Sequence, residues 1–230
     1  MTKYNNSNYI NTFAVYGSFY NFKIDDFIFN CRNLLKISRN SSVSQNIDAI
    51  FIMMNPGSGY PLDINSVANY DLSNYPNISN NCTFPINLFP AHPDDVQYFV
   101  MEIMDLKVWN NIYVVNLSDL IDPNSNTSFK IKRRKFRSLL YNTNSMDIHS
   151  IFSRDDTELL SLGILDSTIT KISCWGRNNP KYLTNPAVTF FNLNKILLKG
   201  LPKSDKNIHN YYYLKPRGRS SIVSSLIIHI

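Results

Sequence analysis

The sequence predicts an α/β fold, a three-layer α/β/α sandwich whose central, mostly parallel four-stranded sheet is preceded by an N-terminal hairpin. Three features of the chain favour this fold. Short, nearly continuous apolar runs end abruptly at polar residues, as strands buried on both faces of a parallel sheet do. Segments with helical spacing of apolar residues separate these runs. This order of strands and helices is typical of an open sheet with helices on both faces.

The N-terminal part of the chain predicts the hairpin and a first helix. Gly17 and Ser18 separate the apolar segments 13–16 and 19–22, which is typical of two strands joined by a tight turn. Apolar residues then recur at the spacing of one helix face, so residues 25–37 are predicted to be helical. These apolar residues are Phe27, Ile28, Cys31, Leu34 and Leu35.

The middle of the chain predicts the centre of the sheet. Residues 47–54 form a nearly continuous apolar run and are predicted to be the first buried strand. A long loop rich in Asn and Pro is predicted over residues 60–93, and loops of this length often carry function. The clearest helix is predicted over residues 94–109, where acidic residues precede an apolar stripe. Residues 112–115 are predicted to be the second buried strand.

The C-terminal part predicts two further strands and two further helices. A helix is predicted over residues 157–165, followed by a third strand at 169–174. A second helix is predicted over residues 188–199, closed by Gly200. The fourth strand is predicted at residues 210–214.

Composition indicates one domain that stays in the cytoplasm. The chain has 230 residues, which suits a flexible N-terminus over residues 1–12 and a single domain over residues 13–230. Its three cysteines are widely spaced and include no Cys-x-x-Cys pair, so neither a zinc ribbon nor a disulfide framework is expected. The first residues lack an apolar signal-peptide core, and no run approaches the ~18 apolar residues of a membrane span. We expect no metal, no cofactor and no membrane.

The charge distribution favours nucleic acid as a partner. The formal net charge is +6, and six cations fall within the eight residues 130–137. Aromatic residues interleave with these cations, which suits contact with nucleic acid, although such a run can equally be a solvated face or a flexible element. The residues expected to contact the nucleic-acid backbone are Lys132, Arg133, Arg134, Lys135, Arg217 and Arg219.

Polar and aromatic residues follow the predicted strands at the points where they end. Asn55, Asn116 and Trp175 come directly after the first three strands, and His209 precedes the last. In open α/β sheets, ligands bind at the carboxyl ends of the strands. We therefore expect these side chains to share one site.

The strand-end motifs, taken in order, resemble those of the uracil-DNA glycosylase superfamily. The motifs are Met53-Met54-Asn55-Pro56-Gly57, the segment 112–117, the segment 172–176 and Ile208-His209-Asn210. A closer resemblance, over roughly residues 13–216, is to a bacterial family known as the domain-of-unknown-function family numbered 1643. Asn210 stands where either family carries Pro, and Met54 replaces the residues typical of active glycosylases.

The resemblance implies a role for each candidate residue. Asn55 would hold the attacking water and His209 would donate to the anionic leaving base. Asn116 would read a pyrimidine edge, with Phe84 and Trp175 against the base. Each residue also has a structural interpretation: Asn55-Pro56-Gly57 as a turn, Asn116 as a strand cap and Trp175 as core.

The resemblance implies a protein that binds nucleic acid, DNA more than RNA, and hydrolyses the N-glycosidic bond of a flipped base. The alternative is a catalytically inactive DNA-binding or protein-interaction module, such as a mobile element or defence system would encode. The departures at Met54 and Asn210 favour this alternative.

Overall fold

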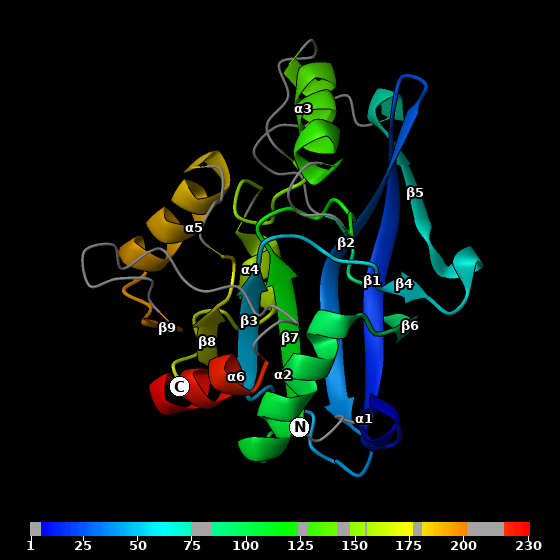
Figure 1. Cartoon of the computed structure of the whole chain (residues 1–230). Helices are drawn as coiled ribbons and strands as arrows, with labels where there is room; N and C mark the ends of the chain where they lie inside the picture. Colours follow the sequence, from blue (N-terminus) through cyan, green and yellow to red (C-terminus); the bar gives the residue numbers. More distant parts are fainter. Residues whose placement is uncertain are drawn as a thin grey trace.

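The computed structural model describes residues 6–74, 84–123, 128–141, 148–154, 156–176, 181–201 and 219–230. Helices lie on both faces of a nine-stranded mixed sheet (Figure 1), and the fold is α/β. The strand order is β4-β6-β1-β2-β7-β3-β8-β9, and β5 pairs with a further stretch of β1.

Parallel pairing is confined mainly to one part of this sheet. It joins β7 (Asn111–Asn116), β3 (Ala49–Met53), β8 (Thr170–Ser173) and β9 (Leu198–Lys199). All five residues of β3 are buried, which confirms the prediction of a strand covered on both faces. The strands predicted at 112–115 and 169–174 are confirmed as β7 and β8.

The rest of the sheet is built on a long antiparallel hairpin. β1 (Phe13–Ile24) pairs along its whole length with β2 (Phe27–Arg39), and β2 pairs antiparallel with β7. The outer strands, within residues 60–93, are β4 (Tyr60–Pro61), β5 (Ala68–Asp71) and β6 (Phe89–His92), with 3-10 helices at Ile64–Ser66 and Leu72–Asn74.

The prediction of a central four-stranded, mostly parallel sheet was therefore wrong, because the sheet has nine strands and mixed pairing. The first error concerns Gly17 and Ser18, which lie inside β1. The chain turns instead at Asp25, whose φ is 52°. A Cβ at Gly17 would collide with the ring of Phe19, so glycine makes room for that ring rather than for a turn.

The second error concerns residues 25–37, which are not helical: residues 27–37 belong to β2. Ser18 pairs with Leu34 whereas Phe19 pairs with Arg32, so Asn33 is an extra residue in β2. Such a bulge shifts the alternation of side chains between the two faces of a strand. Phe29 and Cys31 therefore pack on one face and Leu35 on the other, and their spacing imitates that of a helix.

The two faces of the sheet carry separate cores. Ala49, Phe51 and Met53 of β3 pack on one face, and Ile50 and Ile52 pack on the other. The first face is covered by α1 (Asn6–Thr12), α2 (Asp95–Leu106) and α6 (Arg219–His229). The second face is covered by α3 (Ser128–Tyr141), α4 (Thr157–Ser161) and α5 (Lys181–Leu193).

The helix predictions had mixed outcomes. The helix predicted at 94–109 is confirmed as α2, whose N-cap Asp94 accepts hydrogen bonds from the backbone of Val96 and Gln97. The helix predicted at 157–165 is shorter, since α4 ends at Ser161. The prediction for 188–199 was wrong at both ends, because α5 begins at Lys181 and ends at Leu193, and β9 follows.

Two further predictions concern residues near the ends of the chain. Residues 6–12, assigned to the flexible N-terminus, form α1, and the strand predicted at 210–214 lies outside the described residues. No helix in the described part of the chain is both long and apolar enough to cross a membrane.

Candidate functional site

Parallel pairing brings the three strand-end residues to one edge of the sheet. Met53 lies opposite Asn116 in the pairing of β3 with β7, and Ile52 lies opposite Ser173 of β8. Asn55 and Trp175 each follow their strand by two residues. All three therefore lie at the carboxyl ends of the strands, where open α/β sheets bind ligands.

Asn55 is held by the backbone of two loops. Its side-chain Nδ2 donates to the carbonyl of Pro56 at 2.8 Å and to the carbonyl of Asp122 at 2.9 Å. The backbone N–H of Asp122 in turn donates to the Pro56 carbonyl at 3.1 Å. With Nδ2 committed to these carbonyls, Oδ1 is the side-chain atom that can accept a hydrogen bond from a bound water.

Asn116 is a fully buried amide without a partner. Its side chain has 0% exposure, and neither Nδ2 nor Oδ1 makes a hydrogen bond. It continues the face of β7 that carries Ile112 and Val114, so it points toward the side of the sheet that α2 covers. An unpaired buried amide is costly, by about 1–3 kcal/mol. This orphaned donor and acceptor is the strongest chemical signal at the edge.

A second unpartnered amide, Gln97, lies at the start of α2. Its Nε2 and Oε1 are buried and make no hydrogen bond. A Cβ at Gly59 would come within 3.0 Å of Gln97 Nε2 and 3.1 Å of Arg32 Nη1. The loop that follows β3 therefore packs directly on this amide and on the guanidinium of Arg32. Gln97 was not predicted as a site residue, although its position three residues after the N-cap Asp94 is a capping-box pattern.

Trp175 and Phe84 do not join Asn116. Both are buried in the core on the opposite face of the sheet, with 1% and 2% exposure. The ring of Phe84 stacks on Tyr20, with centroids 4.4 Å apart, and the guanidinium of Arg154 lies 5.0 Å from it. His209 and Arg217 lie outside the described residues, and Arg219 begins α6.

The basic run forms α3, a helix with two different faces. Phe129, Phe136 and Leu140 are buried together with Arg133, whose guanidinium lies 4.1 Å from the ring of Tyr182. Lys130, Arg134 and Lys135 are exposed. Of the four α3 cations predicted to contact a nucleic-acid backbone, the structure therefore brings Arg134 and Lys135 to the surface and buries Arg133.

Lys132, the fourth of these cations, ties α3 to the carboxyl edge. Its Nζ donates to the carbonyl of Ile121 at 2.6 Å and lies 3.5 Å from Asp122 Oδ2. Ser128 Oγ donates to the same carboxylate at 2.7 Å. Because the backbone of Asp122 holds Asn55, α3 and the loop after β3 are linked through one residue.

A buried network of charged side chains includes Asp119, which follows the end of β7 by three residues. Arg154 donates to Asp119 Oδ2 at 2.6 Å and to both carboxylate oxygens of Glu158 at 2.7 and 2.8 Å. The hydroxyl of Tyr20 donates to the same Asp119 oxygen at 2.8 Å. The side chains of Arg154 and Asp119 have 0% exposure. This network was not predicted, because the i, i+4 spacing of Arg154 and Glu158 is its only sign in the sequence.

The neighbouring His149 is held neutral. Burial lowers its pKa well below the ordinary value, and the positive charges of Arg133 and Arg154 lower it further. Its Nδ1 lies 2.9 Å from the hydroxyl of Ser118, and its backbone carbonyl accepts a hydrogen bond from the N–H of Asp119.

We expect Asp119 to make stability depend on pH. Burial raises its pKa to about 6, with Arg154 opposing the rise and Glu158 adding to it. Because this exceeds the ordinary value of 3.8, the folded state holds a proton that the unfolded state releases. The contribution of Asp119 is therefore fully present below about pH 4 and is lost as pH rises through about 6.

Urea unfolding of the wild type and Asp119→Asn at a series of pH values tests this. The free energy of unfolding of the wild type, relative to that of the variant, should fall as pH rises from about 4 to about 6. A difference that stays constant across this interval would contradict the assignment.

No family model, curated protein or solved structure matches the chain. Within the part of the chain that the structure describes, no group of three or more His, Cys, Asp or Glu side chains could hold a metal ion. The candidate site is therefore assigned from its own residues. They are the unpartnered amides of Asn116 and Gln97, the side chain of Asn55, which is held by two carbonyls, and the exposed cations of α3.

Proposed function

We propose that the protein binds nucleic acid, DNA in the first instance, along the exposed face of α3 and reads a base at the carboxyl edge of the sheet. The observation that carries the proposal is the row of solvent-facing cations on α3, namely Lys130, Arg134 and Lys135. Such a row neutralises phosphates and releases their counterions, which supplies sequence-independent affinity.

The position of α3 supports this proposal. Figure 1 shows the helix beyond the end of β7, and the contacts of Lys132 with Ile121 and Asp122 fix it there. A nucleic-acid backbone lying on α3 would thus run along the end of the sheet at which the strand before Asn55 stops.

An exposed aromatic ring beside α3 also favours nucleic acid. Phe27, at the tip of the β1–β2 hairpin, is 44% exposed, and the ammonium of Lys135 lies 4.0 Å from its ring centroid. An aromatic ring next to a cation is a common platform on which single-stranded bases stack. Phe27 therefore takes the stacking role that the sequence analysis gave to Phe84.

The orphaned amide of Asn116 supports base reading. A side-chain amide offers one donor and one acceptor side by side, which complements the amide edge of a pyrimidine. Hydrolysis of the N-glycosidic bond is the reaction this arrangement would serve, with the Oδ1 atom of Asn55 holding the water. An amide oxygen is not a strong base, so Asn55 would position the water rather than deprotonate it.

A cleavage screen separates the active from the inactive form of the proposal. Single-stranded and duplex oligonucleotides carrying varied bases are incubated with the protein, and alkali reveals any abasic site. Cleavage that Asn55→Ala slows supports hydrolysis. Tight binding with no cleavage across the panel indicates a binding module, and no binding at all favours a protein-interaction module.

Neutralising the exposed face of α3 should weaken DNA binding. The triple variant Lys130→Gln, Arg134→Gln and Lys135→Gln should bind about 10–100-fold more weakly at low salt. The slope of log affinity against log salt should fall in magnitude by about 2–3, since each lost phosphate contact retains its counterions. Fluorescence anisotropy with a labelled oligonucleotide at several salt concentrations measures both quantities.

The matched control removes the same charge elsewhere. Lys36→Gln, Lys107→Gln and Lys195→Gln lie on β2, after α2 and after α5. An equal loss of affinity in this control would mean that net charge, and not α3, binds DNA. Arg133 is left intact in both proteins because its burial would confuse a loss of binding with a loss of stability.

A further inference from the structure

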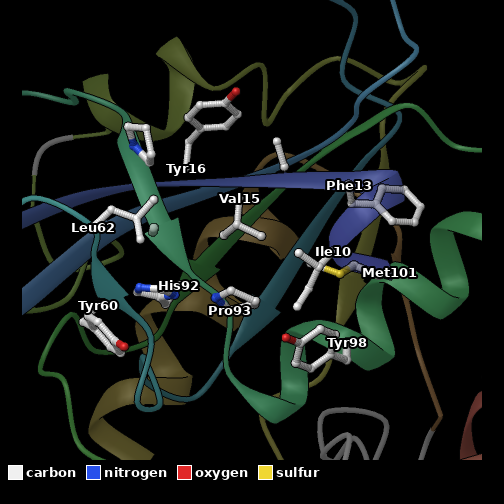
Figure 2. Close-up of a pocket in the computed structure, with 13 residues that line it drawn as sticks. Ile10, Phe13, Val15, Tyr16, Tyr60, Leu62, His92, Pro93, Tyr98 and Met101 are labelled. Carbon is white, nitrogen blue, oxygen red and sulfur yellow. The ribbon is translucent and has the colours of Figure 1, made fainter. Parts of the chain in front are cut away.

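A separate pocket lies on the α2 side of the sheet, between β1, β4, β6, α1 and α2. It has a volume of about 530 Å³, within the range of roughly 300–1,000 Å³ typical of small-molecule sites. Figure 2 shows Val15 at its centre, with Leu62 and His92 on one side and Ile10 and Met101 on the other. None of the residues proposed to contact nucleic acid lines it.

The lining of this pocket is uncharged. Among the described residues that line it there is no Asp, Glu, Lys or Arg, and the polar side-chain groups come from tyrosines and His92. Burial raises the pKa of the Tyr98 hydroxyl, so this group stays neutral. A charged ligand would lose its water here without gaining an ionic partner, which is strongly unfavourable.

The walls of the pocket are rich in flat rings. Phe13, Tyr60, His92 and Tyr98 contribute rings from four different elements, whereas Figure 2 shows the Tyr16 ring on the other side of β1 from Val15. The rings of Tyr60 and His92 lie 4.5 Å apart and are tilted by 41°. Flat rings pack favourably against one another, face to edge or offset, beyond the area they bury. Ring-shaped ligands would therefore fit this wall better than aliphatic ones of equal size.

The mouth of the pocket leaves apolar side chains in water. Ile10, Tyr60 and Leu62 are 53%, 55% and 57% exposed. Single exposed apolar residues are ordinary, but a group of them around one concave pocket marks a ligand site. A ligand that covered this mouth would remove these side chains from water.

We propose that this pocket binds an uncharged small molecule built on a flat ring with one hydrogen-bonding group. The ring packs among the aromatic side chains, and the polar group pairs with a ring nitrogen of His92. The site shares no residue with the proposed nucleic-acid surface, so each of the two proposals can be confirmed or contradicted without the other.

Titration with indole, an uncharged flat ring with one N–H donor, tests this proposal. The methionine methyl groups of the full chain are labelled with ¹³C and followed by NMR. A saturable shift is expected for Met101, which lines the pocket, and not for Met53 or Met104, which lie in the same core away from it. A dissociation constant of about 0.1–1 mM is expected for so small a ligand.

Two comparisons make the result decisive. Indole-3-acetate, an anion of similar shape, should bind at least ~10-fold more weakly than indole, because none of the described residues that line the pocket is a Lys or an Arg. Ile10→Trp and Leu62→Trp should each weaken indole binding at least ~10-fold by filling the mouth from exposed positions. Ile28→Trp, at an exposed position on the hairpin, is the control and should bind as the wild type does.

Several outcomes would overturn the proposal. They are the absence of a Met101 shift in the wild type, equal binding of the anion, and unchanged binding in both tryptophan variants of the mouth. Circular dichroism establishes that each variant is folded before it is titrated.

Discussion

Replacing Arg154 with methionine is expected to lower the free energy of unfolding by about 3–5 kcal/mol at neutral pH. The guanidinium is the shared partner of Asp119 and Glu158, and all three side chains are almost fully buried. Without it, two carboxylates and the hydroxyl of Tyr20 face each other in a core that water does not reach. Because whole domains are stable by only about 5–15 kcal/mol, this variant should be close to unfolding. Urea denaturation followed by circular dichroism measures the loss.

A surface ion pair provides the matched control. Arg39 lies 3.0 Å from Asp105, but the two side chains are 19% and 55% exposed. Arg39→Met should therefore lower stability by about 1 kcal/mol or less. Adding Asp119→Asn and Glu158→Gln to Arg154→Met should restore much of the lost stability, since no buried charge remains unpaired. Equal effects of Arg154→Met and Arg39→Met would show that the buried network is not important for stability.

Replacing Asn116 with leucine should have opposite effects on stability and on base recognition. The buried amide has no partner, so an apolar side chain of similar size should raise the free energy of unfolding by about 1–3 kcal/mol. The same change removes the donor and acceptor that are proposed to read a base. Any preference for one base over an abasic analogue at a single position should then fall by about 10–100-fold. Thermal unfolding and competition binding measure the two effects.

Asn111, at the other end of β7, is the control for this experiment. Its Nδ2 donates to the carbonyls of Ser44 and Asn46 at 2.8 and 3.1 Å. Asn111→Leu leaves those carbonyls unpaired and should lower stability by about 1–3 kcal/mol without changing base preference. If Asn116→Leu behaves as Asn111→Leu does, Asn116 is an ordinary structural residue. If the wild type shows no base preference, base reading fails while binding along α3 can still hold.

The strands and helix at the centre of the fold could be predicted from sequence because their patterns are local. Five consecutive apolar residues define β3, and an acidic N-cap before an apolar stripe defines α2. The strand β2 could not, because the bulge at Asn33 is set by pairing with β1 and converts its alternation into apparent helical spacing. Because residues 25–37 were predicted to be a helix, the predicted sheet was mostly parallel instead of mixed.

At the candidate site, too, residues marked by a local pattern could be predicted, and contacts between distant residues could not. Asn55 and Asn116 could be found from sequence, since each follows a recognisable buried strand. The burial of Arg133 could not, because it depends on Tyr182, a residue on a different helix. The network of Arg154 could not either, since Asp119 and Tyr20 reach it from distant parts of the chain.

The short strands at the limits of the sheet have a consequence for how the molecule behaves among its own copies. β4 and β9 are two residues long and β5 has four, so within the described residues each end of the sheet offers few unpaired N–H and C=O groups. Pro61 in β4 and Pro90 in β6 also lack the N–H that a further strand would need. Long exposed edges are templates for aggregation, and short or proline-bearing edges suppress it. The nine-stranded sheet should therefore resist growing into a neighbouring molecule, even at the high concentrations that purification requires.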